Sequence, residues 1–453
     1  MSSIMNLSSN DLQDSKTRQN YTACVVGCGR TGLVTAGLFI EAGFKVIGVD
    51  SNSHLIHQLQ KGVSPFTETD LRKFIEPKIK NKRFLSTTNI RKAISKSSVI
   101  VVGVSASLDS KKKPDYSRFE KTCKDIGMSL TSGSLVMFQN TMGPGMTQTV
   151  VKEILENASG LKAGENFGIA YFSTLNNASN PSDNLHNGTK IVGGVTKRSS
   201  KVACLILETI TNSNIVRVKD VKIAEAVKLL EEAYKEVNLA FANEFAKFCE
   251  KAGIDFVTVR DLTNPINCSG MAGLHNPRNS YILVNEAEAL DVKLRMLSLS
   301  TKINDETLDH AIRLTREALR TTKKNLRRSK IAVFGVSTLP NRKKVAHSAT
   351  KKLVKQLKKM GANIKVYDPF FTPNELTSMN YDAEKTMSQT VEGIDCIVVA
   401  VGHERFSRLN LKRLQLLMKQ PAAIVDMAQV IDPVRAEKAG FVYRGFGRGI
   451  WTK

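Results

Sequence analysis

Residues 25–32 read Val25-Val26-Gly27-Cys28-Gly29-Arg30-Thr31-Gly32, a GxGxxG sequence that directly follows a short apolar run at residues 23–26. An apolar pattern typical of a helix follows at residues 33–42, and a second apolar run at residues 46–49 is closed by Asp50. The order of strand, tight turn, helix, strand and acid is that of a dinucleotide-binding βαβ unit. The stretch therefore predicts a doubly wound α/β fold.

Each part of this βαβ unit has a role in holding a pyrophosphate. We expect Gly27 to make the tight turn, Gly29 to let the backbone approach the ligand, and Gly32 to let helix and strand pack closely. Arg30 and Thr31 begin the predicted helix, where free N–H groups and the positive end of the helix dipole attract phosphate. These five residues are candidate cofactor contacts; the alternative is a glycine-rich turn in another kind of α/β unit.

Two residues outside the glycine stretch are expected to contact the same cofactor. Asp50 lies eighteen residues after Gly32. Its carboxylate can accept hydrogen bonds from a ribose 2′-hydroxyl and would repel a 2′-phosphate, so NAD is predicted rather than NADP. Thr141 precedes a Gly-Pro-Gly turn at the carboxyl end of a predicted strand, the edge at which doubly wound sheets bind ligands. We expect Thr141 on the nicotinamide side, or else as an ordinary turn residue.

The chain of 453 residues is too long for one core, and its patterns predict three domains after a tail. Residues 1–21 are polar and are expected to be a disordered tail rather than a signal peptide. Residues 22–216 alternate apolar runs with helical stretches and predict an NAD-binding, Rossmann-like domain. Residues 217–328 predict a central helical domain, and residues 329–453 predict a second doubly wound domain without a glycine fingerprint.

Composition excludes several classes of protein. Hydrophobic residues make up 42% of the chain, an ordinary share for a globular protein, and no apolar run approaches the about 18 residues of a membrane span. The seven cysteines are scattered without a Cys-x-x-Cys pair, which argues against a disulfide framework or a zinc site. We therefore expect a protein of the reducing cytoplasm with no membrane span and no metal centre.

A long apolar stripe runs through the middle of the chain. Its members recur at steps of three and four residues: Val227, Leu230, Tyr234, Val237, Phe241, Phe245 and Phe248. This spacing predicts one face of a long helix that ends near Gly253. Such a face is first of all expected to be core, and it could instead be the seam of a homodimer.

Several segments of the chain form a recognisable set. They are residues 61–68 (KGVSPFTE), 140–147 (NTMGPGMT), 224–229, 237–244, 303–305, 367–369 and 445–448. Together with the glycine stretch they resemble the UDP-glucose/GDP-mannose dehydrogenase family, including the UDP-N-acetyl-hexosamine dehydrogenases, over residues 22–448. The resemblance implies two Rossmann-like domains joined by a long central helix, a sugar nucleotide bound by the second of them, and a place in polysaccharide biosynthesis. It also implies oxidation of a nucleotide sugar from alcohol to acid with two NAD.

The resemblance implies a set of reacting residues, of which this chain keeps only part. In the family a Cys attacks the aldehyde intermediate, a Lys stabilises the oxyanion, a Glu helps hydrolysis, and an Asp and an Asn position the reacting groups. On the matching motifs the Lys is Lys228, whereas the Cys is His275, the Asp is Asn279 and the Asn is Glu232. The family's Pro-Glu-Arg corresponds to residues 173–175, Ser-Thr-Leu, so its Glu is missing.

Lys228, His275 and Glu232 are the candidate catalytic residues. Lys228 could stabilise an oxyanion, or it could be an exposed lysine paired with Glu232, a pair worth about 0.3 kcal/mol. Glu232 could act as a general base or be a solvated charge. His275 can relay a proton near neutral pH but cannot readily hold a thioester-like intermediate, and it could be an ordinary loop residue. Cys268 is a substitute nucleophile only if its loop shifts.

These residues predict an NAD-dependent oxidoreductase acting on a CH–OH group of a nucleotide sugar. Without the Cys, a single oxidation is chemically easier to defend than a two-step oxidation to the acid. The alternative is a non-catalytic partner or regulator that binds NAD or a sugar nucleotide. The net charge of +24 fits either a polyanionic partner or attraction of the sugar nucleotide itself. No nucleic-acid motif accompanies the short basic clusters, so we do not expect nucleic acid as a main partner.

Overall fold

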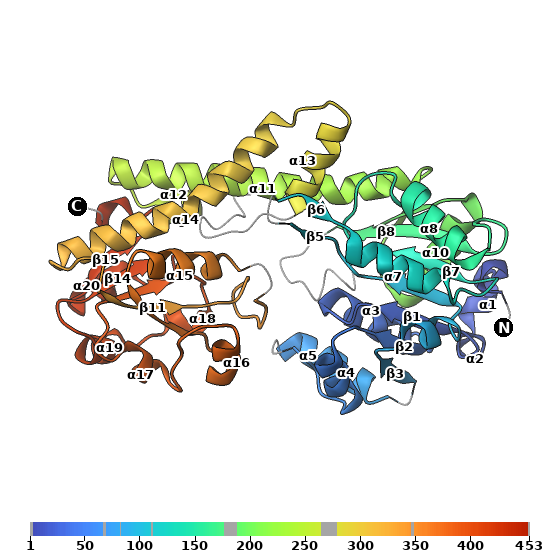
Figure 1. Ribbon diagram of the computed structural model, residues 1–453, viewed down its shortest axis with the longest axis horizontal. Helices are drawn as coiled ribbons and strands as arrows, with labels where there is room; N and C mark the ends of the chain where they lie inside the picture. The colour runs from blue at the N-terminus through green and yellow to red at the C-terminus, as the bar shows by residue number, and fades with distance from the viewer. Residues whose placement is uncertain are drawn as a thin grey trace. The chain divides into compact units, whose positions relative to one another are not determined.

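The computed structural model describes residues 3–66, 69–81, 83–109, 112–175, 188–263, 279–345 and 348–451. The chain divides into two compact units (Figure 1). Unit 1 comprises Met1–Ala233 and Arg278–Lys293, and unit 2 comprises Tyr234–Pro277 and Leu294–Lys453. The predicted central helical domain therefore contributes helices to both units. Its longest helix, α11 (Val221–Ala252), begins in unit 1 and ends in unit 2.

Unit 1 is built on an eight-stranded sheet in the order β10-β9-β8-β7-β4-β1-β2-β3. The strands are β1 (Thr22–Val26), β2 (Lys45–Val49), β3 (Phe84–Thr87), β4 (Val99–Val102), β7 (Leu135–Phe138), β8 (Gly168–Thr174), β9 (Lys190–Gly194) and β10 (Ile215–Arg217). All neighbouring pairs are parallel except β8 and β9, which run antiparallel and place Lys190 opposite Thr174. The carboxyl ends of β1, β4 and β7 therefore meet at one edge, where a doubly wound sheet binds its ligand.

Helices cover both faces of this sheet because alternate strand residues point to opposite sides. In β1, Ala23 and Val25 face one apolar core, while Cys24 and Val26 face the other. The first core is closed by α3 (Arg30–Glu41), α5 (Thr69–Ile79) and α10 (Lys197–Ile210). The second is closed by α7 (Ser117–Gly127), α8 (Lys152–Ser159) and the start of α11.

The first residues of the chain differ from the disordered tail that their polar composition predicts. They form three short helices, η1 (Ile4–Asn6), α1 (Ser9–Gln13) and α2 (Ser15–Arg18). Ile4, Met5 and Leu12 are buried in the first core of unit 1, and the Ile4 amide donates a hydrogen bond to the Gly133 carbonyl. Three apolar side chains in a polar segment are enough to anchor it, because each removes its surface from water.

Unit 2 contains a five-stranded parallel sheet in the order β12-β11-β13-β14-β15. The strands are β11 (Lys330–Phe334), β12 (Asn363–Tyr367), β13 (Cys396–Val399), β14 (Ala423–Asp426) and β15 (Val442–Gly445). One face packs on α14 (Arg295–Thr321) and α15 (Ala349–Lys359), and the other on α19 (Leu411–Leu417) and α20 (Pro433–Lys438). Two doubly wound, Rossmann-like sheets confirm the predicted fold class.

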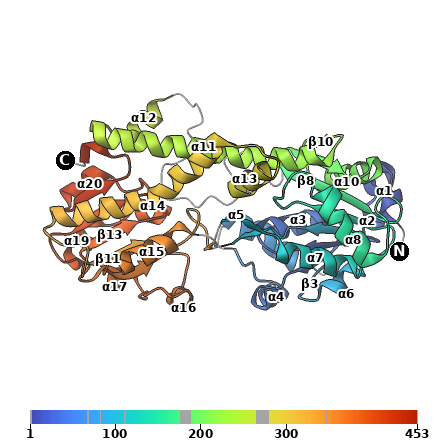
Figure 2. The ribbon, with the colours of Figure 1, turned by 45° about the horizontal axis from the view of Figure 1, so that its top comes forward.

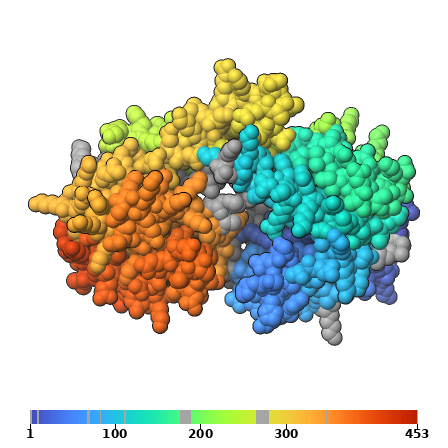
Figure 3. All heavy atoms as spheres, in the orientation of Figure 1, coloured from blue at the N-terminus to red at the C-terminus, as the bar shows by residue number. Residues whose placement is uncertain are grey.

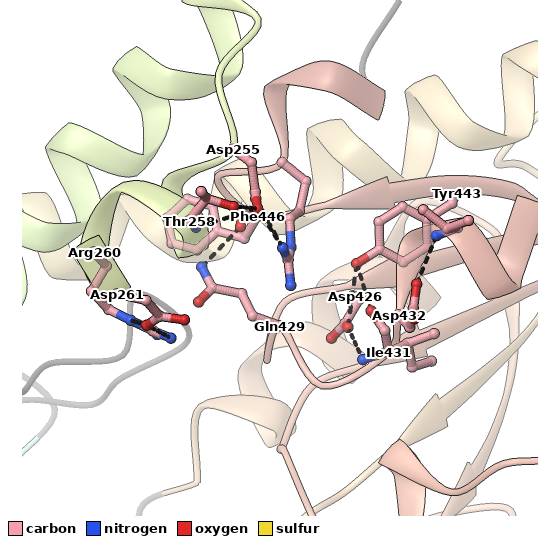
Figure 4. Close-up of polar contacts among 12 residues, drawn as sticks. Asp255, Thr258, Arg260, Asp261, Asp426, Gln429, Ile431, Asp432, Tyr443 and Phe446 are labelled. Atoms are coloured by element: carbon pink, nitrogen blue, oxygen red, sulfur yellow. Dashed lines mark hydrogen bonds and ion pairs between the residues drawn. The ribbon is translucent and has the colours of Figure 1, made fainter.

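A buried polar network ties the end of the chain into unit 2 (Figure 4). Asp255, which caps α12 (Phe256–Leu262), accepts from the Thr258 hydroxyl at 2.8 Å and from Arg448 Nη1 at 2.9 Å. Asp426, at the end of β14, accepts from the Ile431 amide at 2.7 Å and from the Tyr443 hydroxyl at 3.4 Å. These bonds satisfy carboxylates that burial would otherwise make costly.

The apolar stripe of α11 is largely exposed, so the expectation that it is core is wrong for most of its members. Figure 2 shows α11 as a single long helix. Tyr234, Phe241 and Phe248 expose 61%, 58% and 57% of their surface. The core of unit 2 is instead reached by small residues of α11, such as Ala242 and Ala246, and Ala246 lies against Gly447, which follows β15.

Two negative findings concern the described ranges. None of their helices is both long and apolar enough to cross a bilayer. Within the same ranges no group of three or more His, Cys, Asp and Glu side chains could hold a metal ion, and all six cysteines are free and buried. Cys268 lies outside the described residues.

Candidate dinucleotide and reaction site

The glycine turn between β1 and α3 has the geometry that a pyrophosphate requires. Gly27 has a φ of +98°, a left-handed conformation that side-chain-bearing residues avoid, and its amide donates to the Val49 carbonyl at 2.8 Å. A Cβ on Gly32 would lie 1.8 Å from the Gly27 oxygen, so only glycine lets α3 pack against β1 here. A Cβ on Gly29 would meet no atom within 4 Å, which leaves open space above the turn for a ligand.

The start of α3 lies at this open space and has no side-chain cap. Gly29 is the N-cap residue and has no side chain to accept from the first amides of the helix. Arg30 and Thr31 are the first two residues of α3, and Thr31 is exposed. Free N–H groups and the positive end of the helix dipole suit a phosphate at this position, as the sequence predicts.

Asp50 is held beside the same turn. One carboxylate oxygen accepts from the Cys28 amide at 2.9 Å, and the other accepts from the Asn52 amide at 2.9 Å. These bonds fix the carboxylate at the carboxyl end of β2, next to the glycine turn. A ribose could approach it with its hydroxyls, whereas a 2′-phosphate would meet negative charge, so the geometry fits NAD.

The turn after β7, residues 139–147, carries Thr141 at the same edge of the sheet. Thr141 and Asn140 are both buried, and neither amide atom of the Asn140 side chain has a hydrogen-bond partner among the described residues. Buried amide groups without partners are rare, because each costs about 1–3 kcal/mol. Asn140 is therefore a polar group available to a ligand of this edge, and sequence reasoning missed it.

Glu225 of α11 clamps this turn. Its carboxylate accepts from the Gly145 amide at 2.5 Å, from the Thr147 amide at 2.9 Å and from the Thr147 hydroxyl at 2.6 Å. Burial raises the pKa of Glu225 although these hydrogen bonds oppose the shift. Glu225 lies three residues before Lys228, so the clamp joins the turn that carries Thr141 to the helix turn that carries Lys228.

Lys228 is held between two carboxylates of its own helix. Its Nζ lies 3.1 Å from Glu231 Oε2 and 3.0 Å from Glu232 Oε1. Burial on its own would lower the pKa of Lys228, but the charges of Glu232 and Glu231 prevail and raise it. The lysine is therefore a fixed cation, and the predicted pairing with Glu232 is present. Glu231 was missed, although its spacing of three residues from Lys228 was a visible signal.

A third carboxylate reaches the turn from α13 (Asn279–Ala289). A Cβ placed on Gly143 would lie 2.3 to 2.6 Å from the carboxyl atoms of Glu286, so this group rests directly on the turn. Burial raises the pKa of Glu286. Burial, followed by the charge of Glu286, raises the pKa of the nearby Tyr116 to about 12, although a hydrogen bond with the backbone of Gly143 opposes the shift.

Two further positions from the family motifs are His275 and Thr174. His275 lies outside the described residues. Thr174, where the family motif has its Glu, accepts a hydrogen bond from Lys190 Nζ at 3.0 Å. Burial lowers the pKa of Lys190 to about 8. Thr174, which stands where the family has its Glu, is therefore next to the buried Lys190.

The corresponding acid of unit 2 is used differently. Asp368 ends β12 as Asp50 ends β2, but one of its oxygens accepts from the Val336 and Ser337 amides at 2.8 and 3.2 Å. The same oxygen lies 3.1 Å from His403 Nε2, and the other accepts from the Phe370 amide at 2.9 Å. Both acids thus accept from backbone amides, but the Asp368 side chain is fully buried against His403, whereas Asp50 is only partly buried.

A glycine turn with open space above it, an uncapped helix start and an acid at the end of the second strand define a dinucleotide-dependent oxidoreductase of the doubly wound class. The chain belongs to the UDP-glucose/GDP-mannose dehydrogenase family. The NAD binding domain of that family matches residues 21–211, the central domain matches residues 222–306, and the UDP binding domain matches residues 332–433. NAD is therefore the cofactor of unit 1, and the chain is an NAD-dependent nucleotide-sugar dehydrogenase by family.

Similar proteins extend over nearly the whole chain. The UDP-N-acetyl-D-mannosamine dehydrogenase of Pyrococcus horikoshii is 26% identical over 434 residues, which cover 94% of this chain and 99% of the relative. The structure of the UDP-D-ManNAc dehydrogenase from the same organism superposes with a TM-score of 0.83 at 25% identity, over 95% of this chain and 100% of that one. The NDP-N-acetyl-D-galactosaminuronic acid dehydrogenase of Methanosarcina mazei Go1 has a TM-score of 0.75 at 26% identity and covers 100% and 99%.

Proposed function

We propose that the protein oxidises a CH–OH group of a UDP-linked N-acetylated sugar in one two-electron step. The observation that carries the proposal is the position of Lys228, a fixed cation beside Glu232 on the helix turn that Glu225 joins to Thr141. The similarity to dehydrogenases of UDP-N-acetyl-D-mannosamine and of NDP-N-acetyl-D-galactosaminuronic acid supports an N-acetylated amino sugar as substrate, and the UDP binding domain supports UDP as the carrier. The product would then serve the synthesis of a polysaccharide.

The cofactor would be held by the residues of the glycine turn. Gly27, Gly29 and Gly32 shape the turn, Arg30 and Thr31 offer the helix start, and Asp50 receives the ribose hydroxyls. When bound, NAD accepts the two electrons and the hydrogen that leave the carbinol carbon. Thr141 would contact the nicotinamide side.

The proton chemistry falls to the carboxylates next to Lys228. Glu232 Oε1 is the closest base to Nζ and can take the proton of the substrate hydroxyl, while Lys228 stays charged and stabilises the negative charge that develops on the oxygen. The carbinol loses its C–H hydrogen to the cofactor and its O–H proton to Glu232, which leaves a carbonyl group. His275 is the alternative base.

The six cysteines of the described residues are all buried, which supports a single step. A second oxidation to the acid needs a thiolate that captures the aldehyde. Burial raises the pKa of Cys28, which lies in the glycine turn, and the charge of Asp50 raises it further. Burial also raises the pKa of Cys123 to about 12. Neither thiol can become a nucleophile near neutral pH.

We propose a homodimer as the working form, in the cytoplasm where free thiols persist. Tyr234, Phe241 and Phe248 recur every seven residues on one face of α11 and are more than half exposed. A seven-residue apolar repeat on a helix pairs well with a second copy of itself.

The test measures NADH formation by the purified protein with NAD and a panel of UDP-, GDP- and dTDP-linked sugars, with and without Lys228→Ala. We expect turnover of a UDP-linked N-acetylated sugar, one NADH per sugar, and its loss in the variant. Two NADH per sugar would contradict the single step. Tight NAD binding without turnover of any sugar would instead support a non-catalytic binding protein, a function consistent with the changed residues at positions 174, 275 and 279.

A further inference from the structure

The positive charge of the chain is concentrated in one stretch of unit 2. Residues 313–360 contain sixteen Lys and Arg and a single acid, Glu317, and so supply +15 of the net +24. This stretch does not include any of the residues proposed to bind NAD or to react. Residues 332–360 lie in the UDP binding domain, whose ligand is itself anionic, so the charge that needs another explanation is that of the exposed helix faces.

Five of these cations lie on one face of α15. Because successive residues of a helix are about 100° apart, the five lysines fall within an arc of about 120°. They are Lys351, Lys352, Lys355, Lys358 and Lys359, and all are exposed. Leu353, Val354 and Leu357 form the opposite face and are buried in the core of unit 2. The helix is amphipathic, and its entire outer face is cationic.

A second row lies on the last half of α14. Arg313, Arg316 and Arg320 are exposed at steps of three and four residues and therefore share one face. Glu317, the single acid of the stretch, is 4.0 Å from Arg313 in an exposed pair, which contributes little in water. The row continues into Lys323, Arg327 and Arg328, which are also exposed.

The two rows form one continuous surface. Helices α14 and α15 pack against each other (Figure 1), and Arg316 Nη2 lies 4.0 Å from the sulfur of Met360 at the end of α15. The Arg328 amide donates to the Gly361 carbonyl at 2.8 Å, and the side chain of Arg327 lies against Gly361. The amber and orange atoms of these segments reach the surface in the space-filling view (Figure 3). We name this set of residues on α14, α15 and the turn between 323 and 328 the basic surface.

We propose that the basic surface binds the phosphate headgroups of an anionic phospholipid bilayer. Clusters of four to eight Lys and Arg on an amphipathic helix bind acidic lipids through charge alone, without insertion of a spanning segment. The long apolar stems of the lysines can rest at the acyl boundary while the ammonium groups stay at the headgroups. Met360, which exposes 39% of its surface at the end of the lysine row, adds an apolar contact at the same depth.

A bilayer fits this surface better than a nucleic acid does. Proteins that hold single strands stack the bases on exposed aromatic side chains. Within residues 313–345 and 348–360 the exposed large apolar side chains are Leu339 and Met360, and neither is aromatic. The outer face of α15 also lacks the amide and hydroxyl side chains that read base edges, since its exposed residues are lysines.

The experiment compares two full-length variants with the same change of charge. The first is Lys351→Gln, Lys355→Gln, Lys358→Gln and Lys359→Gln together, on the basic surface. The control is Lys92→Gln, Lys96→Gln, Lys121→Gln and Lys124→Gln together, which neutralises four exposed lysines of unit 1. Glutamine has nearly the helix propensity of lysine, so both variants should keep their fold and their NAD affinity. Each protein is sedimented with vesicles of phosphatidylcholine alone and of phosphatidylcholine mixed equally with phosphatidylglycerol.

We expect the wild type and the control to sediment with the mixed vesicles and not with phosphatidylcholine alone. The α15 variant should bind at least about tenfold more weakly, since each neutralised lysine removes a favourable contact with the surface potential. Salt of about 1 M, which shortens the Debye length to about 3 Å, should release the wild type. Equal binding by the two variants would overturn the proposal. So would binding to duplex DNA by a wild type that leaves the mixed vesicles in solution.

Discussion

The carboxylate of Glu225 lies 2.6 Å from the hydroxyl of Thr147, seventy-eight residues away in the chain. The same side chain also accepts from the Thr147 and Gly145 amides, so three donors of one turn converge on one buried acid. The turn between β7 and α8 is thus held by α11 rather than by its own strand. Changes in α11 should therefore reach the cofactor edge of the sheet.

Glu225→Ala should destabilise unit 1, because it leaves those three donors buried without an acceptor. We expect a loss of about 2–4 kcal/mol in the free energy of unfolding, measured by urea denaturation. Glu225→Gln keeps one acceptor oxygen and should lose less. Equal stability of the wild type and the alanine variant would show that the clamp does not hold the turn.

The raised pKa of Glu225 predicts how the stability of the protein changes with pH. Burial raises the pKa of Glu225 in the folded protein, whereas an unfolded Glu titrates at about 4.3. The folded state therefore holds the proton more tightly. Its stabilising contribution is fully present below the unfolded pKa and is lost as the pH rises through the raised folded value. Relative to Glu225→Gln, the wild type should become less stable as the pH rises over this window. A constant difference between the two unfolding free energies would contradict the assignment.

Two glycines of the turn should affect different properties, Gly32 the stability of the fold and Gly29 the binding of NAD. Gly32→Ala places a Cβ against the Gly27 oxygen and should cost about 1–3 kcal/mol of stability. Gly29→Ala meets open space, so it should leave the melting temperature of the free protein unchanged and weaken NAD binding instead. Thermal melting with and without NAD checks both. Stabilisation by NAD that is undiminished in Gly29→Ala would place the pyrophosphate elsewhere.

Asp50 should decide between NAD and NADP. Asp50→Asn keeps an acceptor for the Cys28 amide and removes the negative charge, so it should raise the affinity for NADP while the turn stays intact. Titration calorimetry with both cofactors gives the ratio of dissociation constants, and Asp50→Glu, which keeps the charge, is the control. An unchanged ratio in Asp50→Asn would exclude a ribose contact at this residue.

Lys228→Met should lower kcat about 10²- to 10⁴-fold and leave the affinity for NAD unchanged, because it removes the cation at the reacting oxygen. Lys251→Gln, an exposed lysine at the end of the same helix, is the matched control and should keep full activity. Steady-state kinetics with the active sugar gives kcat and KM separately. A rise in KM alone would make Lys228 a substrate-binding residue without a catalytic role.

Phe241→Asp should yield a monomer with an unchanged circular dichroism spectrum, because Phe241 is 58% exposed and its ring contact within the chain is with Phe245 of the same helix. Sedimentation equilibrium measures the mass. The control is Leu262→Asp on α12, at an apolar residue that is even more exposed, and it should leave the dimer intact. A wild type that is already monomeric would remove the role proposed for the α11 face.

Features formed by residues close together in the chain could be predicted from the sequence, whereas contacts between distant residues could not. The glycine turn and Asp50 follow from local order, because one βαβ unit sets the positions of both within thirty residues. The contacts of Glu225 with Gly145 and of Glu286 with Gly143 join segments about eighty or more residues apart, and no periodicity reports them. The burial of Ile4 and the exposure of Phe241 were missed because hydrophobic pattern alone does not say which surface covers a residue.

The two sheets share one architecture, but the acids that follow their second strands differ in burial. In unit 1, Asp50 is partly exposed and accepts from the Cys28 and Asn52 amides, while in unit 2 Asp368 is buried and is held by Val336, Ser337, Phe370 and His403. The Asp368 side chain is fully buried, so it is closed to a ribose. Each chain should therefore take up a single dinucleotide, in unit 1.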